Sequence, residues 1–118
     1  MALHNTLGKL GEILALSWLK KNGYEVVEHN WRYGRFEIDV VAVKKGVLHF
    51  VEVKSRYESP FGHPEDGVTR KKFNRLKIAA QGYMNKQPGH RWIQYDILAI
   101  TFHRGREPAY FFLEDVYF

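Results

Sequence analysis

Two acidic residues and one basic residue, Asp39, Glu52 and Lys54, have the types and the spacing to hold a metal ion beside a phosphate. They flank Lys45 and Gly46, which stand between two apolar segments in a position typical of a tight β-hairpin turn. If these two residues are the centre of the turn, Asp39 and Glu52 face each other across the strands. Side chains alternate along a strand, so Lys54 shares the face of Glu52. We therefore expect the Cβ atoms of the two acids to lie about 5 Å apart.

This pair of acids favours a site for Mg²⁺ or Mn²⁺. Like charges that face each other destabilise a sheet, and a divalent cation between two carboxylates reverses that penalty. Such a cation orients and acidifies a water molecule for phosphodiester hydrolysis, while Lys54 holds the water or the phosphate. A structural role is the alternative, in which Glu37 and Lys54 form a cross-strand ion pair and Asp39 accepts backbone hydrogen bonds. Spacing alone favours this alternative, because charge pairs on strands are common.

The elements that position these residues follow from hydrophobic periodicity and from turn residues. Asn5 and Thr6 can cap a first helix, which Gly23 ends, and Thr69 can cap a second helix. In chain order, we expect a helix at 5–22, strands at 24–28, 36–43 and 47–55, a loop at 56–68, a helix at 69–86, a strand at 92–102, and one or two strands at 109–118.

The expected fold class is α/β, with a mixed central sheet. Both faces of the predicted hairpin are mostly apolar, so we expect helices to cover both sides of the sheet. The chain has 118 residues and shows no repeat or linker, which predicts a single domain spanning 1–118.

Composition narrows the classes of protein further. The chain has no cysteine, which excludes disulfide scaffolds, thiolate nucleophiles and thiolate zinc sites. No segment approaches the roughly 20 apolar residues that span a bilayer, and no basic segment followed by an apolar run begins the sequence. We therefore expect a cytoplasmic protein with no membrane partner. A formal net charge of +5 favours a polyanionic partner such as nucleic acid.

Several segments, in order, resemble the YraN family of small bacterial proteins. The resemblance covers nearly the whole chain, residues 5–118, and rests on Gly11-Glu12, Asn30-Trp31-Arg32, Glu37-Ile38-Asp39, Phe50-Val51-Glu52-Val53-Lys54-Ser55-Arg56, Val68-Thr69 and Tyr95-Asp96-Ile97. Asp39 with Glu52-Val53-Lys54 is also similar to the D…(D/E)xK signature of restriction-endonuclease-like nucleases. The resemblance implies the αβββαβ core of that superfamily, which includes Holliday junction resolvases. It also implies a DNA endonuclease that depends on Mg²⁺ or Mn²⁺ and acts on branched or structured DNA.

The resemblance implies further site residues. The main-chain carbonyl of Val53 is a further metal ligand, Glu12 points from the first helix toward the acids, and Gln81 on the second helix lies near the metal. A solvated helix acid is an equal alternative for Glu12, and an ordinary surface glutamine is the favoured alternative for Gln81. The chain departs from the family pattern at Phe36, where glycine is usual. The larger side chain there narrows the approach to the acids.

Basic residues near these positions are candidates for nucleic-acid contacts. The second helix has a basic face and a capped N-terminus, which suit a phosphate backbone, although a solvated helix face is an equal alternative. No base-reading motif is present, so we expect recognition of the backbone or of nucleic-acid shape. The loop at 56–68, with Tyr57, Phe61 and His63, is either a flap over bound nucleic acid or an ordinary surface loop. The predicted contact residues are Arg32, Arg35, Arg56, Thr69, Lys71, Lys72 and Arg75.

Three functional classes remain open on the sequence alone. The first is a metal-dependent endonuclease acting on DNA, with RNA as an alternative substrate. The second is a non-catalytic nucleic-acid-binding module that retains the nuclease fold, which Phe36 favours. The third is a protein-interaction domain that docks through the aromatic segment 110–118, although core packing explains that segment equally well. A second copy of the chain is a further candidate partner.

Overall fold

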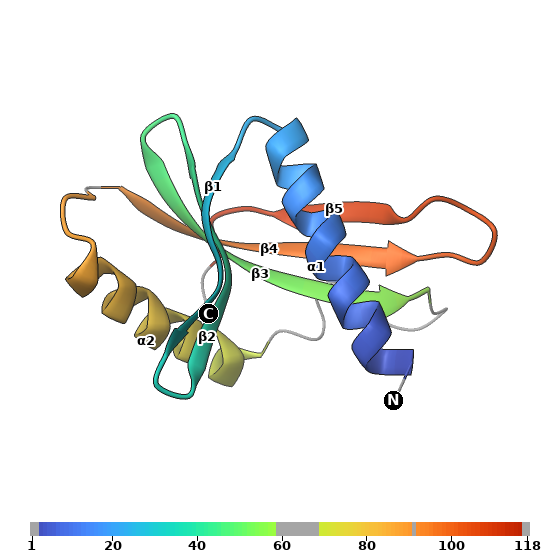
Figure 1. Cartoon of the computed structure of the whole chain (residues 1–118), viewed down its shortest axis with the longest axis horizontal. Helices are drawn as coiled ribbons and strands as arrows, with labels where there is room; N and C mark the ends of the chain where they lie inside the picture. The colour runs from blue at the N-terminus through green and yellow to red at the C-terminus, as the bar shows by residue number, and fades with distance from the viewer. Residues whose placement is uncertain (1–2, 59–68, 91, 117–118) are drawn as a thin grey trace.

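Five strands form one sheet, and two helices pack against it (Figure 1). The computed structural model describes residues 3–58, 69–90 and 92–116. The elements follow the predicted order, with these bounds: α1 Leu3–Lys21, β1 Glu25–Tyr33, β2 Phe36–Lys44, β3 Val47–Tyr57, α2 Arg70–Lys86, β4 Ile93–Phe102 and β5 Ala109–Leu113.

The strand order across the sheet is the same as the order along the chain, from β1 to β5. Neighbouring strands are antiparallel except β3 and β4, which run parallel because α2 connects them as a crossover. The sheet is therefore mixed, as predicted, and its arrangement with the two helices is compatible with a restriction-endonuclease-like core. In the described part of the chain, no helix is both long and apolar enough to cross a bilayer.

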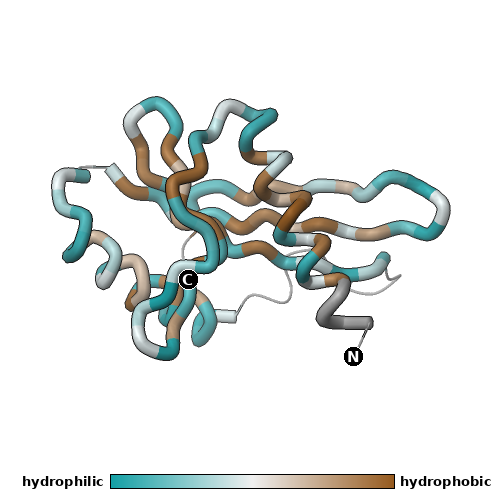
Figure 2. The backbone as a smooth tube through the Cα atoms, viewed as in Figure 1, coloured by the Kyte–Doolittle hydropathy of each residue, from teal (hydrophilic) through white to brown (hydrophobic). Residues whose placement is uncertain are grey.

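Each helix covers one face of the sheet and makes its own hydrophobic core. The α1-side core joins Ala15 and Leu19 to strand residues such as Val51. The α2-side core joins Phe73 and Leu76 to strand residues such as Phe50. Hydrophobic residues accordingly gather along the central strands, and hydrophilic residues mark the turns (Figure 2). The expectation that helices cover both sides of the sheet is confirmed.

Local signals in the sequence explain most of the helix and turn boundaries. Thr69 caps α2, since its side-chain oxygen accepts a hydrogen bond from the Lys72 backbone N–H at 3.2 Å. Lys45 and Gly46 both have positive φ angles, 51° and 78°, which is the geometry of a type I′ hairpin turn. The predicted cap of α1 is wrong, because the helix begins at Leu3 and so includes the proposed capping residues.

The first strand is longer than predicted. It runs to Tyr33 and pairs with β2 through a second tight turn, whose central residues are Gly34, with φ 61°, and Arg35. The pairing register shifts between Val26 and Glu28, so a bulge interrupts the alternation by which strands are recognised in a sequence. β5 is one short strand, and most of the predicted loop, including Phe61 and His63, lies outside the described residues.

One polar network lies inside the sheet. His49 and Asp96 are both buried, and His49 Nδ1 lies 2.6 Å from Asp96 Oδ2. The other carboxylate oxygen of Asp96 accepts hydrogen bonds from Gln94 Nε2 at 2.9 Å and from the Asp115 backbone N–H at 3.0 Å. The network therefore ties β3 to β4 and to the segment that follows β5. It satisfies polar groups that burial would otherwise make costly.

Candidate active site at the end of the β2–β3 pairing

The predicted hairpin register is confirmed near the turn and ends before the acids. Val41 pairs with Phe50, as the two-residue turn requires, and the last β2–β3 pair is Val40 with Val51. Beyond this pair β2 stays with β1, whereas β3 stays with β4 for its full length. Asp39 and Glu52 therefore lie at the point where the two strands separate, and not opposite each other in a continuous ladder.

The Asp39 side chain takes the place of the missing ladder contact. Its Oδ2 accepts a hydrogen bond from the Val53 backbone N–H at 2.8 Å, so the structural role foreseen for this carboxylate is partly correct. The Leu48 N–H donates to the Trp92 carbonyl, so even-numbered residues of β3 direct their backbone groups toward β4. Odd-numbered residues direct theirs toward β2. The Val53 carbonyl therefore faces the same opening as Asp39.

The two carboxyl groups interact with each other, and both have raised pKa values. Burial is the largest cause that raises the pKa of Asp39 to about 6, and the Val53 hydrogen bond opposes it. Burial, and then the negative charge of Asp39, raise the pKa of Glu52 to about 8. The Glu52 carboxyl also donates a hydrogen bond to Asp39, which favours its protonated form. Burial and mutual repulsion therefore disfavour the state in which both carboxyl groups are ionised.

Two cavities meet at Asp39, one on each face of the sheet. Val40 packs in the α1-side core, whereas Ile38 and Val41 both pack in the α2-side core, so simple alternation fails around Asp39. Its carboxylate consequently borders both cavities. Both acids are half-buried, so the pair is neither exposed nor sealed from solvent.

The cavity on the α2 side, here called the basic cavity, has a volume of about 220 Å³. It holds both members of the carboxyl pair together with a third acid, Glu37. Its other polar walls are cationic: Arg35 from the β1–β2 turn, and Lys72 and Arg75 from α2. The positive charge of Lys72 lowers the pKa of Glu52, which shows that helix and carboxyl pair interact. Acids and cations therefore face one another across a space open to solvent.

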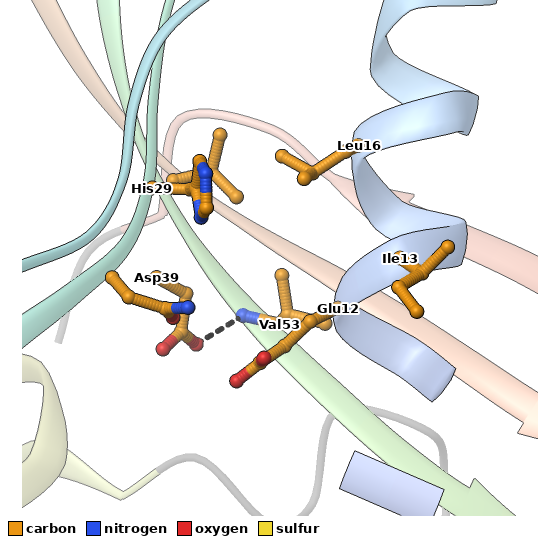
Figure 3. A pocket seen from close by; sticks show the side chains of 8 residues that line it. Glu12, Ile13, Leu16, His29, Asp39 and Val53 are labelled. Atoms are coloured by element: carbon orange, nitrogen blue, oxygen red, sulfur yellow. Dashed lines mark hydrogen bonds between the residues drawn. The ribbon is translucent and has the colours of Figure 1, made fainter. Parts of the chain in front are cut away.

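The cavity on the α1 side, here called the α1 cavity, has a volume of about 100 Å³ and contains Glu12 (Figure 3). Glu12 reaches from α1 toward Asp39, and its negative charge contributes to the raised pKa of that group. The helix can come this close because residue 11 is a glycine and has no side chain. A Cβ at this position would lie only 1.7 Å from Ser55 Oγ. The structure therefore brings Glu12 to the acid pair, as the resemblance implied.

Lys54 lies two residues after Glu52 on β3. It shares the α2-side face with Glu52 and is half-buried, but it does not line either cavity. The predicted ion pair between Lys54 and Glu37 is wrong, because the strands separate before those residues would meet. Glu37 instead lies opposite Arg32 across β1 and β2, with Arg32 Nε at 3.9 Å from Glu37 Oε2.

The remaining predicted residues divide between the site and the surface. Gln81 is exposed and donates a hydrogen bond to Asn85 at 3.0 Å, which fits the surface role favoured for it. Lys71 is exposed, and Thr69 serves as the helix cap. Arg56 is half-buried on β3. Of the seven basic or polar candidates, those that line the basic cavity are Arg35, Lys72 and Arg75.

Sequence reasoning missed several residues that line the cavities. His29 and Asn30 border the α1 cavity, and Leu76 borders the basic cavity. The positive φ of Asn30, 51°, is a weak signal in retrospect, since non-glycine residues rarely adopt it. Phe36 does line the basic cavity, as its position suggested, and the Arg35 guanidinium lies 5.5 Å from its ring centre. The ring therefore occupies space beside the acids.

The donor set fits a hard divalent cation. Two carboxylates and one main-chain carbonyl, from Asp39, Glu52 and Val53, are oxygen ligands of the kind that Mg²⁺ and Mn²⁺ prefer. Within the described ranges, no group of three or more side chains of histidine, aspartate or glutamate is arranged to hold a metal. Burial is the largest cause of the raised pKa values of the pair, and the nearby negative charges add to it. A cation bound between the carboxylates would favour their ionised forms.

Comparison with known proteins finds relatives over most of the chain. The model of the uncharacterised protein family UPF0102 matches residues 11–100, a range that includes both cavities. A UPF0102 protein of Bacteroides fragilis (strain ATCC 25285) is 42% identical over 105 residues, covering 89% of this chain and 87% of the relative. One of Clostridium perfringens (strain 13) is 38% identical over 101 residues, covering 85% and 83%. One of Chloroherpeton thalassium is 36% identical over 118 residues, covering 93% and 92%.

Proposed function

The chain belongs to the uncharacterised protein family UPF0102, and we propose that it is a divalent-metal-dependent endonuclease that hydrolyses phosphodiester bonds in DNA. The observation that carries this proposal is the carboxyl pair of Asp39 and Glu52, which opens directly into a cavity with cationic walls. Carboxylates that can hold a metal ion, with cations that face them, are what metal-assisted phosphate chemistry requires.

The metal would be held by the carboxylates of Asp39 and Glu52 and by the Val53 carbonyl. When bound, Mg²⁺ or Mn²⁺ supplies a Lewis acid that acidifies a water molecule and offsets charge on the phosphate. The Val53 N–H fixes the orientation of Asp39, so this ligand is in place before any cation arrives. Glu12, which approaches from α1, is positioned to accept a hydrogen bond from a water molecule near Asp39.

Glu52 must lose its proton to act as a ligand. Because the pKa of Glu52 is raised to about 8, metal binding competes with protonation of this carboxyl group at neutral pH. Activity should therefore rise with pH up to about 8, and tighter metal binding should accompany that rise.

Contacts with the nucleic-acid backbone would come from the cations of the basic cavity and from exposed basic residues around it. Arg32 and Lys71 are exposed, and Arg35, Lys72 and Arg75 border the cavity itself. Such contacts bind phosphates without reading bases, so we propose recognition of backbone shape. The extension to branched or structured DNA rests on the resemblance to Holliday junction resolvases, and RNA is the competing substrate.

A non-catalytic nucleic-acid-binding module is the second candidate, and Phe36 is the observation that favours it. Its ring lines the basic cavity beside the carboxyl pair, where the family pattern has glycine, and so narrows the approach to the acids. This candidate predicts salt-sensitive DNA binding that charge reversal at Lys72 and Arg75 weakens. It also predicts that Asp39→Asn leaves binding intact and that no substrate is cut.

A cleavage assay separates the two candidates. Duplex, flap, four-way junction and single-stranded DNA, with a matched RNA, are incubated with the purified protein and Mn²⁺ or Mg²⁺. The proposal expects metal-dependent cleavage that falls by about 100-fold or more in Asp39→Asn and in Glu52→Gln, because each removes a metal ligand. Binding without cleavage of any substrate, under conditions where metal is bound, would refute the enzymatic proposal and leave the binding module.

A further inference from the structure

An aromatic ring lies exposed at the end of the β1–β2 hairpin, which packs beside α2 (Figure 1). Tyr33 is the last residue of β1, and its exposed fraction is 41%. It pairs with Phe36, which lines the basic cavity, across the turn formed by Gly34 and Arg35. Paired residues on adjacent strands have Cβ atoms about 5 Å apart. The Tyr33 ring therefore lies beside the basic cavity, with part of its surface open to solvent.

The Tyr33 ring is held in place by packing against two elements. It stacks on Trp31, with the ring centres 6.3 Å apart and an angle of 6° between the ring planes. It also lies directly against α2 at Gly82, where a Cβ would come within 2.4 Å of ring atom Cδ1. Trp31 in turn makes an edge contact with Tyr83, which is buried in the α2-side core. The exposed ring is therefore preorganised, because little conformational freedom remains to be lost when a ligand stacks on it.

The surroundings of the ring carry positive charge, which suits a nucleic-acid strand. Arg35, in the turn next to Tyr33, lines the basic cavity, and its guanidinium lies 5.5 Å from the centre of the Phe36 ring. On α2, Arg75 lines the same cavity. It lies seven residues before Gly82, on the same side of the helix and about 10 Å along its axis. A strand whose phosphate occupies the cavity would thus bring a base to the Tyr33 ring within one or two nucleotides.

We propose that Tyr33 is a stacking platform for an unpaired base of the DNA strand whose phosphate enters the basic cavity. Proteins that bind single strands combine cationic grooves with aromatic side chains on which bases stack. Every base has a π face, so this contact reads no sequence and agrees with the absence of a base-reading motif. A base inside a duplex must first lose its pairing and stacking, which disfavours it. The inference rests on the proposed function, and it narrows the substrate class to DNA with unpaired bases, such as flaps, gaps and single strands.

The test uses variants that separate the ring from its packing. Tyr33→Leu keeps an apolar side chain against Trp31 and Gly82 but removes the π face, whereas Tyr33→Phe keeps the ring. Phe111→Leu is the matched control, because Phe111 is an aromatic residue of nearly equal exposure, 43%. It lies on β5, at the opposite edge of the sheet from β1.

Binding is measured by fluorescence anisotropy with two single strands of equal length, one of thymidines and one made entirely of abasic residues. Ca²⁺ replaces Mn²⁺ to prevent cleavage. Both strands carry the same phosphates, so the part of their affinity difference that depends on Tyr33 reports contact with bases. The wild type, Tyr33→Phe and Phe111→Leu should bind the thymidine strand about 5- to 100-fold more tightly than the abasic strand. Tyr33→Leu should lose most of this preference while its affinity for the abasic strand stays close to that of the wild type.

Two results of this experiment would overturn the inference. One is a wild type that binds the two strands equally. The other is a folded Tyr33→Leu that is less stable than the wild type yet keeps the full preference for bases, since that result assigns Tyr33 a packing role alone.

A second readout uses the wild-type chain, so it remains valid if Tyr33→Leu does not fold. A single strand with 5-iodouracil in place of thymine is irradiated in complex with the protein, and the crosslinked residue is identified by mass spectrometry. This base reacts mainly with aromatic side chains that stack on it, so we expect a crosslink at Tyr33. Crosslinks at other residues, with none at Tyr33, would overturn the inference.

Cleavage with Mn²⁺ separates this inference from the endonuclease proposal. If duplex and single strands are cut at equal rates and Tyr33→Leu changes neither rate, the stacking role fails while the endonuclease proposal stands. If binding depends on bases and on Tyr33 in a protein that never cuts, the stacking role stands while the endonuclease proposal fails.

Discussion

Asp39 accepts a hydrogen bond from the Val53 backbone N–H at the point where β2 and β3 stop pairing. The side chain of one strand thus replaces a main-chain partner that the other strand has lost. This contact holds a carboxylate in the opening between the strands, where it meets Glu52 and two cavities. The separation of the strands therefore creates the site, and the contact with Val53 keeps it ordered.

The stability of the metal-free protein should fall as pH rises through the neutral range. Asp39 and Glu52 have raised pKa values, about 6 and about 8, against 3.8 and 4.5 as ordinary values. Between about pH 5 and pH 8 the folded protein therefore binds more protons than the unfolded chain, and linkage requires stability to decrease as pH rises. Urea unfolding across this range should show a loss of about 2 kcal/mol from the pair.

The matched variant for this pH effect is Asp39→Asn with Glu52→Gln, which cannot ionise at either position. Its unfolding free energy should change less between pH 5 and pH 8 than that of the wild type, and it should be the more stable protein at the upper end. Parallel pH profiles for the two proteins would contradict the assignment of raised pKa values to this pair.

Metal binding should release a proton. The pKa of Glu52 is raised to about 8 and its carboxyl must be ionised to bind a cation, so calorimetry in buffers of different ionisation enthalpy should detect proton release on Mn²⁺ binding. Glu52→Gln should abolish the release and weaken binding by about 10-fold or more. Glu12→Gln should weaken binding less, because Glu12 approaches Asp39 from the α1 cavity. Proton release that persists in Glu52→Gln would place the titrating group elsewhere.

The close approach of α1 to the sheet should be sensitive to a single methyl group. A Cβ on Gly11 would lie 1.7 Å from Ser55 Oγ and 2.9 Å from Ser55 Cβ, so Gly11→Ala forces the helix away from β3. We expect a loss of about 1–3 kcal/mol in unfolding free energy, together with weaker metal binding as Glu12 moves with the helix.

Gly8→Ala is the control for this substitution, since a Cβ there meets nothing within 4 Å. Alanine favours the helix over glycine, so this variant should be more stable than the wild type by about 0.5–1 kcal/mol. Adding Ser55→Ala to Gly11→Ala should restore part of the lost stability, because it removes the nearer of the two clashing atoms. Equal effects of the two glycine substitutions would show that α1 does not make this contact.

The buried His49–Asp96 network should carry a large share of the stability. Asp96→Ala removes the partner of buried His49 and the acceptor for the Asp115 N–H, so we expect a loss of about 3 kcal/mol or more. Asp96→Asn keeps the shape and one acceptor oxygen and should lose less. Urea unfolding compares the two variants, and a cost below about 1 kcal/mol for Asp96→Ala would mean that the network contributes little.

Some of the fold could be predicted because its signals are local. Thr69 caps a helix, and Lys45-Gly46 closes a hairpin, through interactions within a few residues of each position. The register from Lys44 to Val40 then follows from the turn alone. The acids are recognisable for the same reason, since the hairpin brings them near each other even though their strands separate.

The rest depends on contacts between distant segments. No residue near Asp39 in the sequence indicates that β2 stays paired with β1 after its pairing with β3 ends. The predicted Glu37–Lys54 pair was wrong for this reason. The length of β1 was missed because a bulge and a positive φ at Asn30 interrupt its pattern. Lys72 enters the cavity through the packing of α2 on the sheet, which the sequence expresses only as an amphipathic helix.

The most direct measurement is the anomalous diffraction of crystals grown with Mn²⁺. We expect one strong peak between the carboxylates of Asp39 and Glu52, with ligand oxygens at about 2.1 Å that include the Val53 carbonyl. The peak should vanish in Asp39→Asn. If no peak appears between these carboxylates at saturating Mn²⁺, or if the peak persists in Asp39→Asn, the proposed metal site is contradicted.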